Sequence, residues 1–340
     1  MPARQTTTTP PASSNQCASS PMAQRSVLVT GATGLLGREV VNAFRLGGWK
    51  VKGTGHSRAD GVDVLRINLQ NEDEVARALD EIKPQVIVHC AAEKAPDRVA
   101  KDPQGARALN VAASASLARL AADPGRGILV IYISTDYVFP GTAGEAPYEA
   151  DDTPRPTNLY GQTKLDGERA VLDEFARAGK QGLGVVLRVP VLYGHAETPS
   201  ESAVNSLLDS VWKAQTEGIE MTMDHWARRY PTNTEDVGRV CRDVAAKYLE
   251  AGSPQNLPRI LQFSSQDEMT KYEICQRLGE MMGLSTAGIK PNMQGNEANS
   301  SAQRPYDCHL STKGLEGLGI DVSTCEFSAW WRREVGAFRK

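Results

Sequence analysis

The stretch SVLVTGATGLLG, residues 26–37, organises the rest of this chain. Its first five residues are typical of a short strand that is buried on both faces of a parallel sheet. Gly31, Gly34 and Gly37 follow as GxxGxxG, and the pattern of residues 38–46 then predicts a helix. Glycines at such a turn allow the backbone to approach a pyrophosphate, and the helix N-terminus offers N–H groups to it. We therefore predict a dinucleotide site here, with three turn glycines that bind no ligand as the alternative.

Strand-like and helix-like segments alternate after this stretch. The predicted strands cover residues 50–55, 64–68, 85–90, 127–134 and 184–189, and the predicted helices cover residues 72–82, 103–122 and 159–178. This alternation predicts βαβ units with right-handed crossovers, and hence an α/β fold with a Rossmann-type, doubly wound parallel sheet. Beyond Gly194 it loosens into helices at 202–216, 234–251 and 269–283 and short strands at 219–223 and 259–263. These segments predict a smaller, mixed α/β C-terminal lobe at the edge of the sheet where ligands bind.

The chain is therefore expected to have four parts. Residues 1–24 are rich in Thr, Ser, Pro and Ala without an apolar face, which predicts a disordered tail. The lack of acidic residues and the presence of Arg4 leave a transit peptide as the alternative. A Rossmann domain over residues 25–194 follows, then a smaller ligand lobe over residues 195–327 that is interleaved with the core, and a C-terminal tail over residues 328–340.

Composition and charge exclude several classes of protein. The net charge of −3 gives no general reason to expect a nucleic-acid partner. No apolar run approaches the ~20 residues that cross a bilayer, so no membrane segment is expected. The six cysteines are scattered singly, with no CxxC pair and no Cys/His spacing suited to zinc. That pattern indicates reduced thiols, no metal site and a cytoplasmic location, with the nucleus as a second compartment.

The end of the second predicted strand indicates which dinucleotide binds. NAD-binding proteins usually place an acidic residue there for the ribose 2′-hydroxyl. Here the strand continues through His56, Ser57 and Arg58, and the first acidic residue is Asp60. A guanidinium can bind a 2′-phosphate through two hydrogen bonds, so Arg58 predicts NADP(H), with a solvated surface arginine as the alternative.

A second group of polar residues predicts chemistry. Tyr160 and Lys164 stand four residues apart at the start of a predicted helix, so both side chains lie on one face. A neighbouring ammonium lowers the pKa of a tyrosine, which can then exchange a proton with a substrate alcohol or carbonyl. Ser134 and Thr135 end the preceding strand, where either hydroxyl can hydrogen-bond the reacting oxygen. A purely structural role for Tyr160 and Lys164 is the alternative.

Together, TGATGLLG, the hydroxyl residues at the strand end and YGQTK resemble the extended short-chain dehydrogenase/reductase superfamily over residues 26–320. Within it, STDYVF at 134–139 and LYGQTK at 159–164 resemble the dTDP-4-dehydrorhamnose reductase branch. That branch reduces a 4-keto sugar nucleotide with NAD(P)H, using a threonine, a tyrosine and a lysine. The resemblance places these catalytic roles on Thr135, Tyr160 and Lys164.

A closer resemblance is to the regulatory β subunits of methionine adenosyltransferase, a family within the same branch. The most specific match is MDHWARRYPTNTEDV at 223–237. Further matches are RSVLVTGATGLLGREV at 25–40, VIVHCAAEKAPD at 86–97, YISTDYVF at 132–139, NLYGQTKLDGE at 158–168, ESAV at 201–204, MTKYE at 269–273 and AQRP at 302–305. The resemblance implies an NADP-binding protein that associates with a separate catalytic subunit and modulates S-adenosylmethionine synthesis. Pro140 departs from the family pattern, which has Asp there, but exchanges one turn for another.

The same resemblance assigns cofactor contacts by position. They fall on the glycine loop, the end of the second strand, and the ends of later strands and helices: Gly31, Thr33, Gly34, Leu35, Leu36, Gly37, Ser57, Arg58, Asn68, Leu69, Ala91, Ala92, Glu93, Asn110, Tyr160, Lys164 and Val189. Because the catalytic set is intact, an NADPH-dependent reductase of keto sugar nucleotides stays open as the second function. A nucleotide-dependent sensor with another partner is the third.

Several aromatic and histidine residues lie outside these motifs. His89, at the end of a buried strand, is predicted to be a satisfied core group rather than a base. His225 and Trp226 either line a ligand cleft or pack in the core, and the sequence leaves both alternatives open. Trp330 and Trp331 are adjacent, so we do not expect both to face inward.

The C-terminal end is the expected partner contact. Its tryptophans and arginines are typical of interface anchors, because rigid rings fill pockets and guanidinium pairs with carboxylates. The resemblance implies that residues 330–340 reach into the methionine adenosyltransferase catalytic subunit. A final amphipathic helix that packs on its own domain is the alternative.

Overall fold

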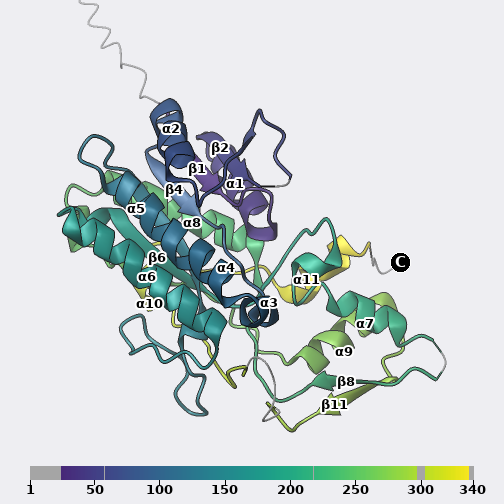
Figure 1. Ribbon diagram of the computed structural model, residues 1–340. Coiled ribbons are helices and arrows are strands. Elements are labelled where there is room, and N and C mark those ends of the chain that lie inside the picture. Colours follow the sequence, from purple (N-terminus) through teal and green to yellow (C-terminus); the bar gives the residue numbers. More distant parts are fainter. Residues whose placement is uncertain (1–23, 57, 217, 297–302, 337–340) are drawn as a thin grey trace, which may run out of the picture.

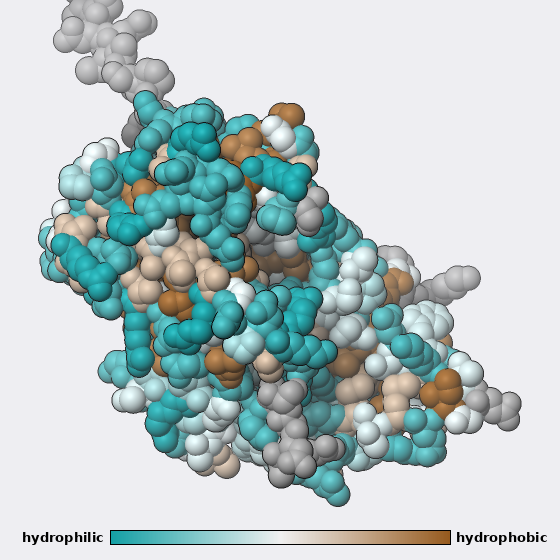
Figure 2. All heavy atoms as spheres, viewed as in Figure 1, coloured by the Kyte–Doolittle hydropathy of each residue, from teal (hydrophilic) through white to brown (hydrophobic). Residues whose placement is uncertain are grey.

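The computed structural model describes residues 24–56, 58–216, 218–296 and 303–336 (Figure 1). Residues 1–23 of the expected N-terminal tail, Ser57 of the expected phosphate site and residues 337–340 of the C-terminal end lie outside the described residues. None of the helices in these ranges is long and apolar enough to cross a membrane. On the face shown in Figure 2, hydrophilic side chains predominate around a central hollow with apolar side chains inside it.

Within the described residues, a seven-stranded parallel sheet forms the centre of the molecule, in the order β10-β6-β5-β4-β1-β2-β3. Its strands are β1 (Ser26–Thr30), β2 (Lys50–Gly55), β3 (Val64–Arg66), β4 (Val86–His89), β5 (Leu129–Thr135), β6 (Gly184–Val189) and β10 (Ile260–Gln262). From β1 the chain builds outward through β2 and β3, then returns to the other side of β1 and continues through β4, β5 and β6. This order confirms the predicted Rossmann-type sheet, and its direction reverses between β1 and β4.

Helices cover both faces of this sheet (Figure 1). On one face, α1 (Leu35–Leu46) packs beside α8 (Thr234–Glu250), and both contribute to one apolar core cluster. On the other face, α2 (Glu72–Ile82), α5 (Ser114–Ala122) and α6 (Leu159–Arg177) contribute to a second cluster. β4 and β5 are buried along their whole length because helices cover them from both sides.

One predicted helix is interrupted next to the candidate site. The segment expected as one helix over 103–122 consists of α4 (Pro103–Arg107), a π-helical turn (Ala108–Ala113) and α5, after a short α3 (Pro96–Lys101). Asn110 lies on this turn with no solvent exposure. The expectation of one continuous helix is wrong because a single wide turn leaves the apolar pattern of a helix almost unchanged.

Two elements after residue 194 belong to the Rossmann domain, one as a covering helix and one as a strand of its sheet. Helix α8 packs against α1, and β10 extends the sheet by pairing with β6. The other C-terminal elements form a small lobe at the lower right of Figure 1. They are α7 (Leu207–Lys213), α9 (Lys271–Met282), α11 (Phe327–Glu334) and the parallel pair β8 (Met221–Asp224) and β11 (Ile289–Asn292). The short parallel pair β7 (Leu192–Tyr193) and β9 (Thr232–Asn233) and the helix α10 (Lys313–Gly317) complete the described strands and α-helices.

Helix α11 packs into the small lobe with both of its tryptophans buried. Trp330 is 2% exposed and Trp331 0% exposed, so the expectation that they do not both face inward is wrong. Adjacent helical residues point about 100° apart, which allows both to be buried when a helix is covered on two sides. Trp330 Nε1 donates to Glu235 Oε1 of α8 at 2.9 Å, the ring of Tyr193 stacks on Trp331 at 6.0 Å, and α11 also contacts α9. Residues 327–334 therefore form the amphipathic helix on its own domain that was the alternative for this segment.

Candidate cofactor and catalytic site

The glycine loop after β1 has the shape of a phosphate cradle. Gly31 has φ +65°, and a Cβ there would lie 2.9 Å from the Ala91 nitrogen, so the loop and the end of β4 approach too closely for a side chain. A Cβ on Gly37 would lie 2.1 Å from the Gly31 carbonyl oxygen, so this glycine lets α1 pack on the loop. Gly34 caps α1 without a side-chain hydrogen bond, which leaves N–H groups of the first helical turn for a ligand.

A cavity of about 400 Å³ lies beside this loop, where the strand order reverses between β1 and β4. Open α/β sheets bind ligands at this position. Seven of the predicted cofactor residues line the cavity: Gly31, Thr33, Arg58, Asn68, Leu69, Ala91 and Ala92. Sequence reasoning missed Thr54, Gly55, Ile67, Gln70 and Leu109, which also line it. Four of these five lie at or just beyond the ends of β2 and β3. The predicted ends of these two strands could therefore have indicated them as cavity residues.

The other predicted cofactor residues within the described ranges are not among those that line the cavity. The side chains of Leu35 and Val189 are buried in the core, and Leu36 is partly buried against it, so the backbones of Leu35 and Val189 are the parts that can meet a ligand. Asn110 Oδ1 accepts from the backbone nitrogen of Glu93 at 2.8 Å, and its Nδ2 donates to the Glu93 carbonyl at 3.0 Å. The structure therefore gives Asn110 the role of holding the backbone at Glu93.

Arg58 reaches the cavity from the end of β2 and pairs with two carboxylates. Its Nη1 donates to Glu197 and, at 2.6 Å, to Glu201 Oε1. Arg38 of α1 donates to Glu201 Oε2 at 2.5 Å. Burial opposes the ionisation of Glu201, but the hydrogen bonds from Arg38 and Arg58 outweigh it and hold the pKa of Glu201 at about 2. The guanidinium predicted for a phosphate thus lies at the cavity, where it meets carboxylates that sequence reasoning missed.

Thr135, Tyr160 and Lys164 converge where β5 ends and α6 begins. Thr135 Oγ1 donates to Asp136 Oδ1 at 2.9 Å, and burial raises the pKa of Asp136 to about 7. Burial also raises the pKa of Tyr160, and a hydrogen bond with the Thr135 hydroxyl offsets only part of this rise. Burial lowers the pKa of Lys164 to about 7, against the pull of the Glu168 carboxylate. A protonated Tyr160 beside Thr135 can donate a hydrogen bond to a carbonyl oxygen.

In this structure burial raises the pKa of Tyr160, which is the opposite direction to the lowering expected from Lys164. The Nζ of Lys164 lies 4.0 Å from the centre of the Tyr132 ring, over its face. The ring of Tyr160 packs edge-on against Tyr137, with 6.0 Å between the ring centres. The helical spacing brings the two residues to one face, but burial is the largest cause of the Tyr160 pKa shift and sets its direction.

A buried ion pair lies behind the catalytic end. Arg188 of β6 and Glu168 of α6 are 1% and 2% exposed and lie 2.8 Å apart. Ser134 Oγ donates to Glu168 Oε1 at 2.5 Å, and Arg188 Nη1 donates to Gln262 Oε1 of β10 at 3.4 Å. This network ties β5, β6 and β10 to the helix that carries Tyr160 and Lys164. His89 is likewise satisfied, as predicted, by Thr30 Oγ1 at 2.6 Å and Ser114 Oγ at 3.0 Å.

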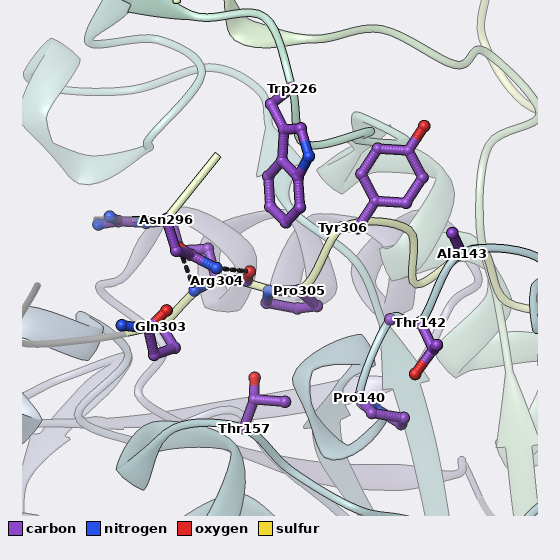
Figure 3. Close-up of a pocket in the computed structure, with 11 residues that line it drawn as sticks. Pro140, Thr142, Ala143, Thr157, Trp226, Asn296, Gln303, Arg304, Pro305 and Tyr306 are labelled. Carbon is purple, nitrogen blue, oxygen red and sulfur yellow. Dashed lines mark hydrogen bonds between the residues drawn. The ribbon is translucent and has the colours of Figure 1, made fainter. Parts of the chain in front are cut away.

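A second cavity, of about 610 Å³, opens between the loop after β5 and the small lobe (Figure 3). In Figure 3 the rings of Trp226 and Tyr306 stand together on one side of it, and their centres are 5.0 Å apart. Asn296 hydrogen-bonds the backbone of Arg304 on another side, at 2.6 and 2.8 Å. Trp226 therefore lines a cavity, whereas His225 Nδ1 is engaged by Thr270 Oγ1 at 2.8 Å. Of the two alternatives, lining a cleft therefore applies to Trp226, and packing applies to His225.

Known proteins are similar to this chain over most of its length. Residues 25–336 match the RmlD substrate binding domain family. The chain is 43% identical to methionine adenosyltransferase 2 subunit beta of Danio rerio over 316 residues, which cover 93% of this chain and 91% of that protein. The chain belongs to the methionine adenosyltransferase 2 subunit beta family. This confirms the resemblance drawn from the MDHWARRYPTNTEDV segment and the glycine loop.

More distant relatives of this beta-subunit family member are reductases. A probable dTDP-4,6-dihydroxy-2-methyloxan-3-one 4-ketoreductase of Streptomyces antibioticus is 31% identical, over 86% of this chain and 89% of that protein. The dTDP-4-dehydrorhamnose reductase of Bacillus anthracis, solved in complex with NADP, has a TM-score of 0.74 at 21% identity and covers 91% of this chain and 98% of that chain. The orthologue from Clostridium acetobutylicum has a TM-score of 0.74 at 25% identity, over 92% and 98%. These structures confirm the fold of the beta-subunit family member.

Proposed function

We propose that this chain is an NADP-binding regulatory subunit that associates with a methionine adenosyltransferase catalytic subunit and modulates S-adenosylmethionine synthesis. The observation that carries the proposal is the 43% identity to methionine adenosyltransferase 2 subunit beta over 93% of the chain. The five cysteines in the described ranges are all free, which supports a reducing compartment, the cytoplasm or the nucleus.

The residues around the first cavity fit NADP(H). A Cβ on Gly31 would clash with the backbone of Ala91, and a Cβ on Gly37 would clash with the Gly31 carbonyl, so both glycines are needed for the tight loop. The N-terminus of α1 follows this loop and suits a pyrophosphate. Arg58 lines the same cavity and suits a 2′-phosphate. When bound, the cofactor supplies a nicotinamide ring that can exchange a hydride.

Calorimetry with NADP⁺ and NAD⁺ tests the choice of cofactor. We expect tighter binding of NADP⁺, because Arg58 gains a charge-assisted contact with its 2′-phosphate. Equal affinity for the two dinucleotides in the unmutated protein would remove the basis for NADP.

Size-exclusion chromatography with the methionine adenosyltransferase catalytic subunit tests the partner. We expect the two proteins to elute as one complex, with a rate of S-adenosylmethionine formation that differs from that of the catalytic subunit alone. Separate elution at micromolar concentrations, with an unchanged rate, would contradict the regulatory function.

We place the partner contact at the C-terminal end, on the exposed basic side of α11. The two tryptophans are core residues, so the exposed basic side chains of α11 are Arg332 and Arg333, of which Arg333 lies 3.4 Å from Glu235 Oε1 of α8. Guanidinium groups at an exposed site can pair with carboxylates on a partner. A variant that carries both Arg332→Glu and Arg333→Glu is expected to lose the complex and keep its thermal melt. Arg119→Glu, an exposed charge reversal on α5, is the matched control. Undiminished association of the double variant would exclude this surface.

A keto sugar nucleotide reductase is the second candidate function. Thr135, Tyr160 and Lys164 together, with the 31% identity to a probable ketoreductase, favour it. Under the regulatory proposal, oxidation of NADPH with dTDP-4-keto sugars is slow or absent, and Tyr160→Phe abolishes whatever turnover exists while cofactor still binds. Turnover near the ~10 s⁻¹ typical of enzymes would favour the reductase instead.

A further inference from the structure

We propose that Glu197 limits the preference of this chain for a dinucleotide with a 2′-phosphate, because it competes with that phosphate for Arg58. The inference rests on the proposed binding of NADP(H) and adds the residue that sets its selectivity. Glu197 lies on the segment that leads from β7 toward the small lobe, far in sequence from the glycine loop.

The contact between Arg58 and Glu197 is open to solvent. Their side chains are 45% and 52% exposed, and both carboxylates that meet Arg58 do so at a single nitrogen, Nη1. An exposed ion pair contributes little to folding stability, so its partners can be exchanged at little cost to the fold. A ligand phosphate that reaches Arg58 therefore meets a carboxylate that is already bound there.

Glu201 differs from Glu197 because it is held from several sides. Its side chain is 12% exposed and accepts from Arg38 at 2.5 Å, and its carbonyl accepts from Lys94 Nζ at 2.5 Å. Arg38 also donates to the carbonyl of Thr33 in the glycine loop at 2.7 Å. Glu201 thus tethers the segment to the glycine loop, and the backbone nitrogen of Glu197 donates to its Oε2 at 3.1 Å. The tether keeps Glu197 beside Arg58.

The charges around Arg58 make the competition act on NADP(H) and not on NAD(H). Three cations, Arg38, Arg58 and Lys94, face the carboxylates of Glu197 and Glu201. A phosphate monoester brings up to two further negative charges, and NAD(H) has none at the ribose 2′ position. Glu197 therefore opposes the binding of NADP(H) and leaves the binding of NAD(H) unchanged. The contact of Arg58 with the 2′-phosphate favours NADP(H), and the competing contact of Arg58 with Glu197 reduces that preference.

The test is calorimetry of NADP⁺ and NAD⁺ with the full chain and its Glu197→Gln variant. We expect the variant to bind NADP⁺ about three- to tenfold more tightly, the range for one partly exposed charge contact, and to bind NAD⁺ as the unmutated chain does. Glu81→Gln, which removes the same charge from an exposed position of α2, is the matched control and changes neither affinity. NADP⁺ affinity that is unchanged or weaker in Glu197→Gln would overturn the proposal.

The same substitution in an Arg58→Ala variant separates competition for Arg58 from a general repulsion between Glu197 and the phosphate. In Arg58→Ala, the gain in NADP⁺ affinity from Glu197→Gln is expected to shrink below about twofold, because the contested guanidinium is gone. An undiminished gain would reject competition at Arg58. If the unmutated chain binds neither dinucleotide, the proposed NADP binding fails and this inference fails with it. If the unmutated chain binds NADP⁺ and Glu197→Gln brings no gain, only the inference fails.

Discussion

Two arginine–glutamate pairs flank the proposed cofactor site, and burial separates their roles. Arg188 and Glu168 are 1% and 2% exposed, inside the sheet and behind the catalytic end. Arg58 and Glu197 are 45% and 52% exposed, at the cofactor cavity. Separating the buried pair leaves a bare charge in the core, whereas the exposed pair can exchange one carboxylate for a ligand. The same two residue types therefore form part of the core in one place and, under the proposed function, meet the cofactor in the other.

The largest expected effect comes from breaking the buried pair of Arg188 and Glu168. Glu168→Ala should lower the free energy of unfolding by about 3–5 kcal/mol, because Arg188 is left without its carboxylate in the core. Glu197→Ala, the same change in the exposed pair, should cost less than about 1 kcal/mol. Chemical denaturation of both variants measures the contrast. Similar losses in the two variants would show that burial does not separate the pairs.

A change of similar size extends the comparison to neighbouring positions of α11. Trp331 has no exposed surface, so Trp331→Ala should cost about 3–5 kcal/mol of folding stability. Arg332 is exposed on the next position of the helix, and Arg332→Ala should cost less than about 0.5 kcal/mol. Thermal and chemical unfolding measure both values. A stable Trp331→Ala variant would mean that α11 is not part of the small-lobe core.

A smaller effect is expected on cofactor affinity when the arginine of the exposed pair is removed. Arg58→Ala should remove about 1.5–3 kcal/mol of NADP⁺ binding and most of the difference from NAD⁺, since the charge-assisted phosphate contact is lost. Arg45→Ala is the matched control, because Arg45 pairs with Asp63 at 2.9 Å with a similar exposure of 47% and 54%. Calorimetry compares the two variants. A loss of NADP⁺ affinity in both would point to a general charge effect.

The smallest expected effect is a pH dependence of folding stability at Lys164, which lies on α6 near the buried pair. The pKa of Lys164, one turn before Glu168, is lowered to about 7 by burial. The unfolded chain then binds more protons than the folded one between pH 7 and the ordinary lysine pKa, so stability rises with pH above 7, and the cost of charging Lys164 is fully present below it. Lys164→Met abolishes this dependence. The unmutated chain should gain about 1–2 kcal/mol relative to Lys164→Met between pH 7 and 9 in denaturant titrations.

A matched lysine gives the control for this pH dependence. Lys83→Met, at an exposed position after α2, should leave the rise of stability with pH as it is in the unmutated chain. If Lys164→Met shows the same rise as the unmutated chain, the ammonium is not desolvated in solution.

Residues that act within one strand–turn–helix unit could be predicted from the sequence. The spacing of Gly31, Gly34 and Gly37 reports a turn that only glycine can make, and the structure has φ +65° at Gly31. The spacing of Tyr160 and Lys164 reports one helical face, and the structure places both at the start of α6. Both features are short-range, so the chain itself specifies them.

Residues that act through contacts between distant segments could not be predicted. Glu197 meets Arg58 across 139 positions, and no local pattern marks either as the partner of the other. The pair of Arg188 and Glu168 depends on α6 lying across β6, and the burial of both tryptophans depends on where α8 and α9 leave room for α11. The direction of the pKa shift at Tyr160 likewise follows from its burial.

The sequence by itself determined the parallel sheet, the glycine cradle, the grouping of Thr135, Tyr160 and Lys164 at one sheet edge, and a resemblance specific enough to indicate the family. Only the tertiary structure decided which arginine is buried and which is exposed, that the C-terminal tryptophans belong to the core, and that carboxylates stand beside the expected phosphate contact. The reason is that periodicity and spacing act over one or two turns of chain. Burial, by contrast, is a property of everything that packs around a residue, and it sets both the cost of a charge and the freedom of a side chain to exchange partners.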